Sequence, residues 1–149
     1  MGRDIISTVL LDFTGLKAEQ DEDDVIGLGA GGAAYFAKYL TATMGILYKI
    51  EVTCLEVPTV SSGTLLLDYD ITAEASAARV EGFDGSSQTD VALAGGNYAA
   101  VGTTKQFLVP GQPTNAHYFY LKNGADQGTS AANFNAGKLM IKFFGHASF

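Results

Sequence analysis

Alternation of apolar and polar residues is the dominant pattern in this chain. From Ile46 to Glu56 the even-numbered positions are apolar, and Lys49, Glu51 and Thr53 stand between them. A period of two residues predicts a half-buried β-strand whose even-numbered side chains face the core. The inward-facing set is Ile46, Tyr48, Ile50, Val52 and Cys54.

Two further segments alternate in the same way and predict two more strands. Near the C-terminus, the apolar face is Leu139, Ile141 and Phe143, and the opposite face is Lys138, Met140 and Lys142. From Thr64 to Ile71, the apolar face is Leu65, Leu67, Tyr69 and Ile71, and Asp68 and Asp70 point to solvent.

The remaining segments carry weaker patterns. Ile5 to Phe13 is apolar on both faces, which is typical of an interior strand or of a strand at a subunit contact. Lys105 to Val109 and Ala116 to Lys122 also predict strands. Tyr35 to Thr43 fits a helix or a strand, and its Tyr, Phe and Thr content favours a strand. Ala73 to Arg79 predicts a short helix.

Glycine-containing turns separate these segments. Pairs such as Asp84-Gly85 and Asn123-Gly124 relax the positive-φ requirement of tight hairpins, and the chain holds 18 glycines in 149 residues. Seven or eight short strands with regular turns predict an all-β fold, an antiparallel β-sandwich resembling a jelly roll, with at most one short helix. We expect one domain over 1–149, in which 1–23 form an N-terminal strand and an acidic loop.

Composition narrows the classes of partner. The formal net charge is −7 and no Lys/Arg cluster exists, which disfavours nucleic-acid binding. No apolar run reaches the roughly 20 residues that cross a bilayer, and no signal peptide is evident, so we expect a protein made in a cytoplasm. The single cysteine, Cys54, cannot form an intramolecular disulfide and is expected to pack inward.

One motif resembles a cofactor loop. The glycines from Gly27 to Gly32 match G-x-G-x-x-G, and Glu51 follows nineteen residues beyond. A dinucleotide site needs a buried strand directly before the glycines and a helix directly after. The acidic run 21–24 precedes instead, so we interpret the motif as a glycine turn and expect no cofactor.

Other candidate chemistry is equally sparse. The run Asp21-Glu22-Asp23-Asp24 could bind calcium, but it lacks the spacing of an EF-hand loop and suits a solvated acidic loop. His117 and His146 each lack a second ligand or a nucleophile at a useful spacing. Asp68 and Asp70 share a face, which could suit glycoside hydrolysis but more often serves solubility. We therefore expect no catalytic residue, no metal site and no enzymatic activity.

Four segments of the chain carry a family resemblance: Asp24 to Gly27, Gly45 to Tyr48, Cys54 to Pro58 and Phe134 to Gly145. They resemble segments of a family of small β-rich proteins of tailed phages that infect marine bacteria. The resemblance runs from Asp24 onward and implies a non-enzymatic virion structural protein, such as a capsid decoration or knob protein or a small fibre component. The implied partners are other copies of the chain, as a homotrimer, and the major capsid protein or other virion proteins.

The N-terminal strand is the expected contact. We predict that its apolar residues lie at a subunit or particle interface. These residues are Ile6, Val9, Leu10, Leu11 and Phe13, within a run that also holds Ile5. The alternative function is a jelly-roll module that binds a carbohydrate or receptor, in which exposed Tyr118 and Tyr120 would stack on sugars.

Overall fold

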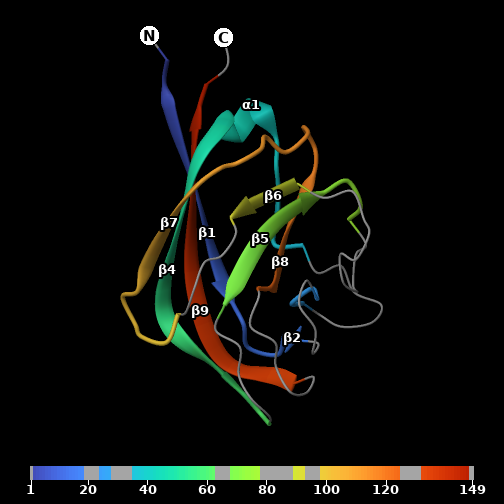
Figure 1. Ribbon diagram of the computed structural model, residues 1–149, viewed down its shortest axis with the longest axis vertical. Helices are drawn as coiled ribbons and strands as arrows, with labels where there is room; N and C mark the ends of the chain where they lie inside the picture. The colour runs from blue at the N-terminus through green and yellow to red at the C-terminus, as the bar shows by residue number, and fades with distance from the viewer. Residues whose placement is uncertain are drawn as a thin grey trace.

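A computed structural model gives the fold, and it describes residues 2–18, 24–27, 35–62, 68–77, 89–92, 98–124 and 132–147. Two antiparallel sheets pack against each other as a β-sandwich, which confirms the predicted all-β class (Figure 1). In the described part, the one helix is the four-residue α1 (Thr41–Met44).

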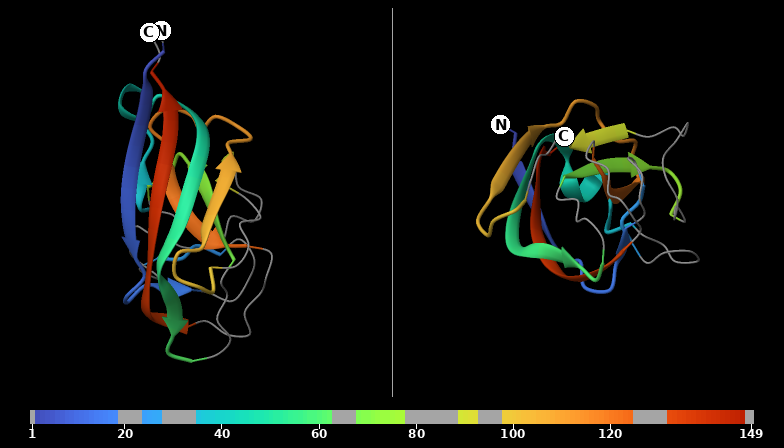
Figure 2. Two further views of the ribbon diagram at one scale, coloured as in Figure 1. Left: turned by 90° about the vertical axis from the view of Figure 1, so that its left-hand side faces the viewer. Right: turned by 60° about the horizontal axis from the view of Figure 1, so that its bottom comes forward.

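The first sheet contains the long strands of the protein. Its order is β1-β9-β4-β7, and β2 also pairs with β9. The bounds are β1 Asp4–Asp12, β2 Lys17–Ala18, β4 Ile46–Val60, β7 Thr104–Leu108 and β9 Ala132–His146. Strand β9 lies between β1 and β4, so the N-terminal strand lies at one edge of this sheet (Figure 2, left).

The second sheet is smaller and has the order β3-β8-β5-β6. Its bounds are β3 Ala37–Lys38, β5 Tyr69–Glu74, β6 Thr89–Ala92 and β8 Tyr118–Asn123. The two sheets face each other through large apolar side chains. The rings of Phe119 on β8 and Phe143 on β9 stack with centroids 4.7 Å apart, which joins the two layers at the centre of the core.

The alternation predicted for the C-terminal strand is confirmed. Leu139, Ile141 and Phe143 are fully buried, while Lys138 and Lys142 stay partly exposed. In β4 the predicted inward positions Ile50, Val52 and Cys54 are also buried.

Strand β4 departs from its predicted face at its start. A register shift lies between Leu47 and Lys49, so Leu47 is buried whereas Ile46 is 47% exposed and Tyr48 is half-buried. A bulge inserts one residue, which moves every side chain before it to the other face. The prediction that Ile46 and Tyr48 face the core was therefore wrong.

Strand β5 is covered on both faces. All six of its residues are buried, and Asp68 and Asp70 are each 8% exposed, so the prediction that these carboxylates face solvent was wrong. Asp70 lies opposite Lys122 in the register with β8, which places a cation beside a carboxylate. The part of this predicted strand at 64–67 lies outside the described residues.

Two further predictions fail for local reasons. Ala73 and Glu74 end β5 rather than starting a helix, because their pairing with β8 takes precedence over helix propensity. Residues 75–77 are not helical either, and the last two residues of that predicted helix, 78–79, lie outside the described residues. The segment 35–43 is divided between β3 and the start of α1, so neither single assignment held.

Candidate interaction surface

The side chains of the first sheet that point away from the second sheet form what we call the outer face. Strand β1 presents alternate residues there: Ile6 is 59% exposed and Leu10 is 62% exposed. The even-numbered residues of β1 are exposed over the whole length of the strand. Exposed branched apolar groups in a row are a feature of surfaces that bind other proteins.

An apolar row crosses the whole outer face. Ile6 lies beside Phe144 of β9, Phe144 beside Lys49 of β4, and Lys49 beside Leu108 of β7. Leu108 is 82% exposed, the highest value among the exposed large apolar residues of the described part. The Lys49 Nζ lies 3.9 Å from the centroid of the Phe144 ring, so its charge lies over the ring. The methylene groups of the Lys49 side chain continue the apolar row.

A second row across the outer face is apolar on β1 and β9 and polar on β4 and β7. Leu10 lies beside Met140 of β9, and Met140 lies beside Thr53 of β4. The hydroxyls of Thr53 and Thr104 are 2.9 Å apart and hydrogen-bonded. The apolar part of this row is therefore confined to the β1 side of the sheet.

Charges on the outer face are paired within the chain. Lys142 Nζ lies 3.8 Å from Glu51 Oε1, and Gln106 donates a hydrogen bond of 2.9 Å to Glu51 Oε2. His146 Nδ1 lies 2.8 Å from Asp4 Oδ1, and the His146 ring stacks on Tyr48 at a centroid distance of 4.4 Å. These charged side chains of the outer face have partners in the chain, whereas Ile6, Leu10 and Leu108 expose apolar groups.

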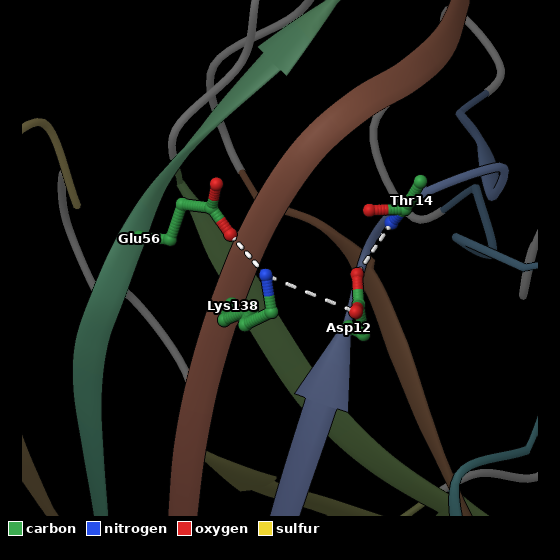
Figure 3. Close-up of polar contacts among 4 residues, drawn as sticks. All are labelled: Asp12, Thr14, Glu56 and Lys138. Carbon is green, nitrogen blue, oxygen red and sulfur yellow. Dashed lines mark hydrogen bonds and ion pairs between the residues drawn. The ribbon is translucent and has the colours of Figure 1, made fainter.

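Lys138 bridges two carboxylates at the far end of β1 (Figure 3). Its Nζ forms a hydrogen-bonded ion pair with Glu56 and lies 3.9 Å from Asp12 Oδ2. Asp12 Oδ1 accepts a hydrogen bond of 2.9 Å from the backbone N–H of Thr14, and this bond is the main cause of a lowered Asp12 pKa. The bond from Lys138 to Glu56 is the main cause of a raised Lys138 pKa.

The open edge of β1 is the second feature of this surface. Backbone pairs in an antiparallel ladder alternate between hydrogen-bonded and non-hydrogen-bonded. The Arg3 carbonyl accepts from the Ala147 N–H, the Phe13 N–H donates to the Gly137 carbonyl, and the register between them has no shift. The odd-numbered residues therefore direct their backbone groups to β9, and the even-numbered residues direct theirs away from it.

A pocket opens beside this edge, between the two sheets. Its volume is about 270 Å³, and Val9 and Leu11 line it on the β1 side. The other apolar and aromatic residues that line it are Leu10, Leu16, Ile26, Tyr35, Phe36 and Leu121. The sandwich is thus not fully closed along β1, and Val9 and Leu11 keep partial exposure.

The five residues predicted to form an interface fall into three environments. Ile6 and Leu10 lie on the outer face, and Val9 and Leu11 pack partly against the core. Phe13 is 0% exposed and its ring lies 4.9 Å from that of Phe134, inside the chain's own core. On this chain, Ile6 and Leu10 are the predicted residues whose side chains a partner can reach most fully.

Other candidate residues do not assemble into a site. Residues 28–32 of the glycine motif and 21–23 of the acidic run lie outside the described residues. Tyr120 is fully buried and donates a hydrogen bond to the Ser76 carbonyl, so the expectation that it is exposed was wrong. Cys54 is buried as predicted, and its Sγ contacts the Tyr98 carbonyl at 3.5 Å. Burial raises the pKa of the Cys54 thiol.

Within the described ranges, no group of three or more His, Cys, Asp or Glu side chains is placed to hold a metal ion. The same part of the chain holds no helix that is long and apolar enough to cross a membrane.

Part of this surface was not identified from the sequence. Leu108 was assigned to a strand, but its outward position was not recognised. The alternation of Lys105, Phe107 and Val109 with Gln106 and Leu108 carries that information. The symmetry of the β1 sequence, described below, was also missed.

Comparisons with known proteins do not identify a function for this surface. No protein-family model matches the chain, and no curated protein matches it. Among solved structures, a chain of the cyanophage Pam1 capsid asymmetric unit is similar at 16% sequence identity and a TM-score of 0.39. The match covers 97% of this chain and 86% of that chain. At this level of similarity the likeness does not by itself assign a fold or a function.

Proposed function

We propose that this chain is a jelly-roll virion structural protein that works by protein–protein contact. The strand order supports the jelly-roll part of the proposal. With β2 set aside, eight strands remain in the described part of the chain. The first sheet holds the first, eighth, third and sixth of them, and the second sheet holds the second, seventh, fourth and fifth. This order is the one that two Greek keys produce when they fold into two four-stranded sheets.

The outer face supports the assembly role. The observation that carries the proposal is the exposed apolar row from Ile6 to Leu108, which lies among charges that are already paired. Jelly rolls are frequent in viral capsid proteins, although a shared fold does not assign a function. The resemblance of four segments to phage virion proteins favours a capsid decoration or knob protein.

The proposed partners are further copies of the chain and the major capsid protein or another virion protein. The homotrimer implied by the resemblance remains a prediction. A three-fold contact uses two different patches on each subunit. The outer face and the open edge of β1 provide two such candidate patches.

Co-sedimentation tests the capsid part of the proposal. Purified chain is mixed with expanded, empty capsids of the phage whose genome encodes it, and bound protein is measured after centrifugation. We expect saturable binding that Leu108→Asp weakens, because the substitution places a charge in the apolar row. Val101→Asp is the matched control, since Val101 is 68% exposed but lies in a turn outside the strands. Absence of wild-type binding would refute the decoration role.

The alternative function is glycan or receptor binding, and one observation favours it. Tyr35 is 40% exposed, and its ring lies 4.7 Å from the ring of half-buried Tyr118, over which Lys38 also extends. Two adjacent aromatic rings at the surface could stack on a sugar. A glycan-array signal that Tyr35→Ala removes, together with no capsid binding, would favour this alternative over the decoration role.

A further inference from the structure

Among the described residues, the backbone groups on the edge of β1 that faces away from β9 have no partner along the whole strand. Asp4, Ile6, Thr8, Leu10 and Asp12 direct their N–H and C=O groups to this side, as the pairing of Arg3 and Phe13 with β9 requires. None of the backbone hydrogen bonds among the described residues ends on these groups. No described strand lies beside β1 on this side (Figure 2, left).

Natural edge strands are usually protected from pairing with another chain, and the described part of the chain gives β1 no such protection. It contains no proline, no lysine and no bulge over nine residues. The other edge strands of the described sheets are shorter: β7 has five residues including Lys105, β6 has four and β3 has two. The unprotected edge is therefore a specific property of β1.

The sequence of β1 is close to a palindrome in residue character. Reading outward from Thr8, Ser7 meets Val9, Ile6 meets Leu10, Ile5 meets Leu11 and Asp4 meets Asp12. Reversing the strand keeps apolar residues against apolar residues at Ile6 and Leu10. A strand with this symmetry suits antiparallel pairing with an identical strand, which is an isologous contact.

We propose that two copies of the chain pair antiparallel through β1, with the two-fold axis at Thr8, so that the first sheets of both copies form one continuous sheet. This inference deepens the proposed assembly role by naming the contact between copies, and it rests on that role only for its biological use. It gives the copies a two-fold contact in place of the homotrimer that the resemblance implies.

The register centred on Thr8 satisfies all the open backbone groups. Thr8 faces the partner's Thr8, Ile6 faces the partner's Leu10, and Asp4 faces the partner's Asp12. Because the even-numbered residues form the hydrogen-bonded pairs, these five pairs exchange two bonds each. Centring the axis on Ser7 would instead leave Asp12 without an opposite residue in the strand.

Both faces of the pairing are also compatible. On the outer face, each carboxylate that meets another at the ends already has a partner in its own chain, because Asp4 Oδ1 lies 2.8 Å from His146 Nδ1 and Asp12 Oδ2 lies 3.9 Å from Lys138 Nζ. On the inner face, Ile5 meets the partner's Leu11, which covers the half-exposed side of the pocket at Val9 and Leu11. The contact would bury apolar groups that the single chain leaves partly exposed.

The first experiment measures mass by light scattering and sedimentation velocity over a range of concentrations. We expect wild type to approach twice 15.6 kDa and Thr8→Pro to remain at 15.6 kDa. The proline removes an N–H that points to the open edge and leaves the bonds to β9 intact. Thr8→Ala, which keeps the N–H, is the matched control and should dimerise like wild type.

Three outcomes would overturn the inference: a monomeric or trimeric wild type, a Thr8→Pro variant that dimerises as well as wild type, or a monomeric Thr8→Ala. Because Thr8→Pro could also unfold the chain, amide hydrogen exchange of wild type gives an independent readout. The amides of Ile6, Thr8 and Leu10 should lose protection on dilution, whereas those of Val9 and Leu11, which bond to β9, should keep it. Equal behaviour of both sets would also overturn the inference.

A cross-link tests the register. Thr8→Cys should form a disulfide-linked dimer on mild oxidation, because facing residues of a hydrogen-bonded pair have Cα atoms about 5.5 Å apart, within disulfide range. The native Cys54 is fully buried and should not compete. Ile6→Cys should not cross-link, because Ile6 faces the partner's Leu10 and lies four residues along the strand from the partner's Ile6. A cross-link through Ile6→Cys and none through Thr8→Cys would refute the register. Capsid binding by monomeric Thr8→Pro is measured separately, so failure of the dimer and failure of the decoration role are distinguished.

Discussion

At the residue scale, the outer face separates charges that have partners from apolar groups that do not. Lys138 and Asp12 show the first class: Lys138 joins Glu56 and Asp12 across three strands, and the Thr14 N–H fixes the Asp12 carboxylate at the end of β1. Ile6 and Leu10 show the second class, since each is more than half exposed. Exposed ion pairs contribute little to stability.

The lowered pKa of Asp12 predicts a pH-dependent contribution to stability. A carboxyl group whose pKa falls below 3.8 on folding stabilises the folded state above that pH, and this contribution is lost as the pH falls through the folded-state pKa. We expect Asp12→Asn to lower the urea midpoint at pH 7 and the difference from wild type to shrink below pH 3.8. A difference that stays constant across this range would contradict the assignment.

At the element scale, strands with one wet face were predictable and strands with both faces covered were not. The alternation in β9 gave the correct faces because Lys138 and Lys142 mark the solvent side. In β5 the same pattern placed Asp68 and Asp70 in solvent, because coverage of the second face depends on tertiary packing. The bulge at the start of β4 was invisible for a related reason, since register is set by the partner strand.

Gly145, near the end of β9, packs against α1 so closely that the position has no room for a side chain. A Cβ on Gly145 would lie 1.9 Å from the Met44 carbonyl oxygen, which is backbone and cannot rotate away. We expect Gly145→Ala to force α1 away from the sheet and to destabilise the fold by about 1–3 kcal/mol, as overpacking does. Urea unfolding measures the loss. Gly2→Ala is the control, because its Cβ would contact nothing within 4 Å, and an equal effect of both variants would contradict the prediction.

At the scale of the whole molecule, the packing of the two sheets determines which of the predicted interface residues are exposed. The apolar run of β1 indicated a contact, and Ile6 and Leu10 are indeed exposed. Phe13 could not be separated from them, because its burial follows from the packing of Phe134 and Tyr69 around it. Leu108 comes from a distant segment, and only the pairing of β4 with both β7 and β9 brings it onto the same face.

Leu10→Asp tests the contact at this scale. In the proposed dimer Leu10 faces the partner's Ile6, so the substitution places a carboxylate against an apolar side chain and close to Asp12 on the same face. We expect the dimer dissociation constant to rise at least about tenfold, which corresponds to about 1.4 kcal/mol. The fold should persist, because Leu10 is 62% exposed in the single chain.

Leu108→Asp is the matched control for this measurement, since Leu108 is also highly exposed on the outer face but lies on β7, at the opposite edge of the sheet. Light scattering at equal concentrations should show a loss of dimer for Leu10→Asp and none for Leu108→Asp. A loss for both variants would instead indicate that subunits meet through the outer face, as a trimer could. A wild type that stays monomeric at high micromolar concentration, and that does not co-sediment with capsids, would contradict both modes of assembly. Because Leu10 and Leu108 lie on opposite edge strands of the sheet, this pair of variants distinguishes a contact centred on β1 from a contact that uses the whole outer face.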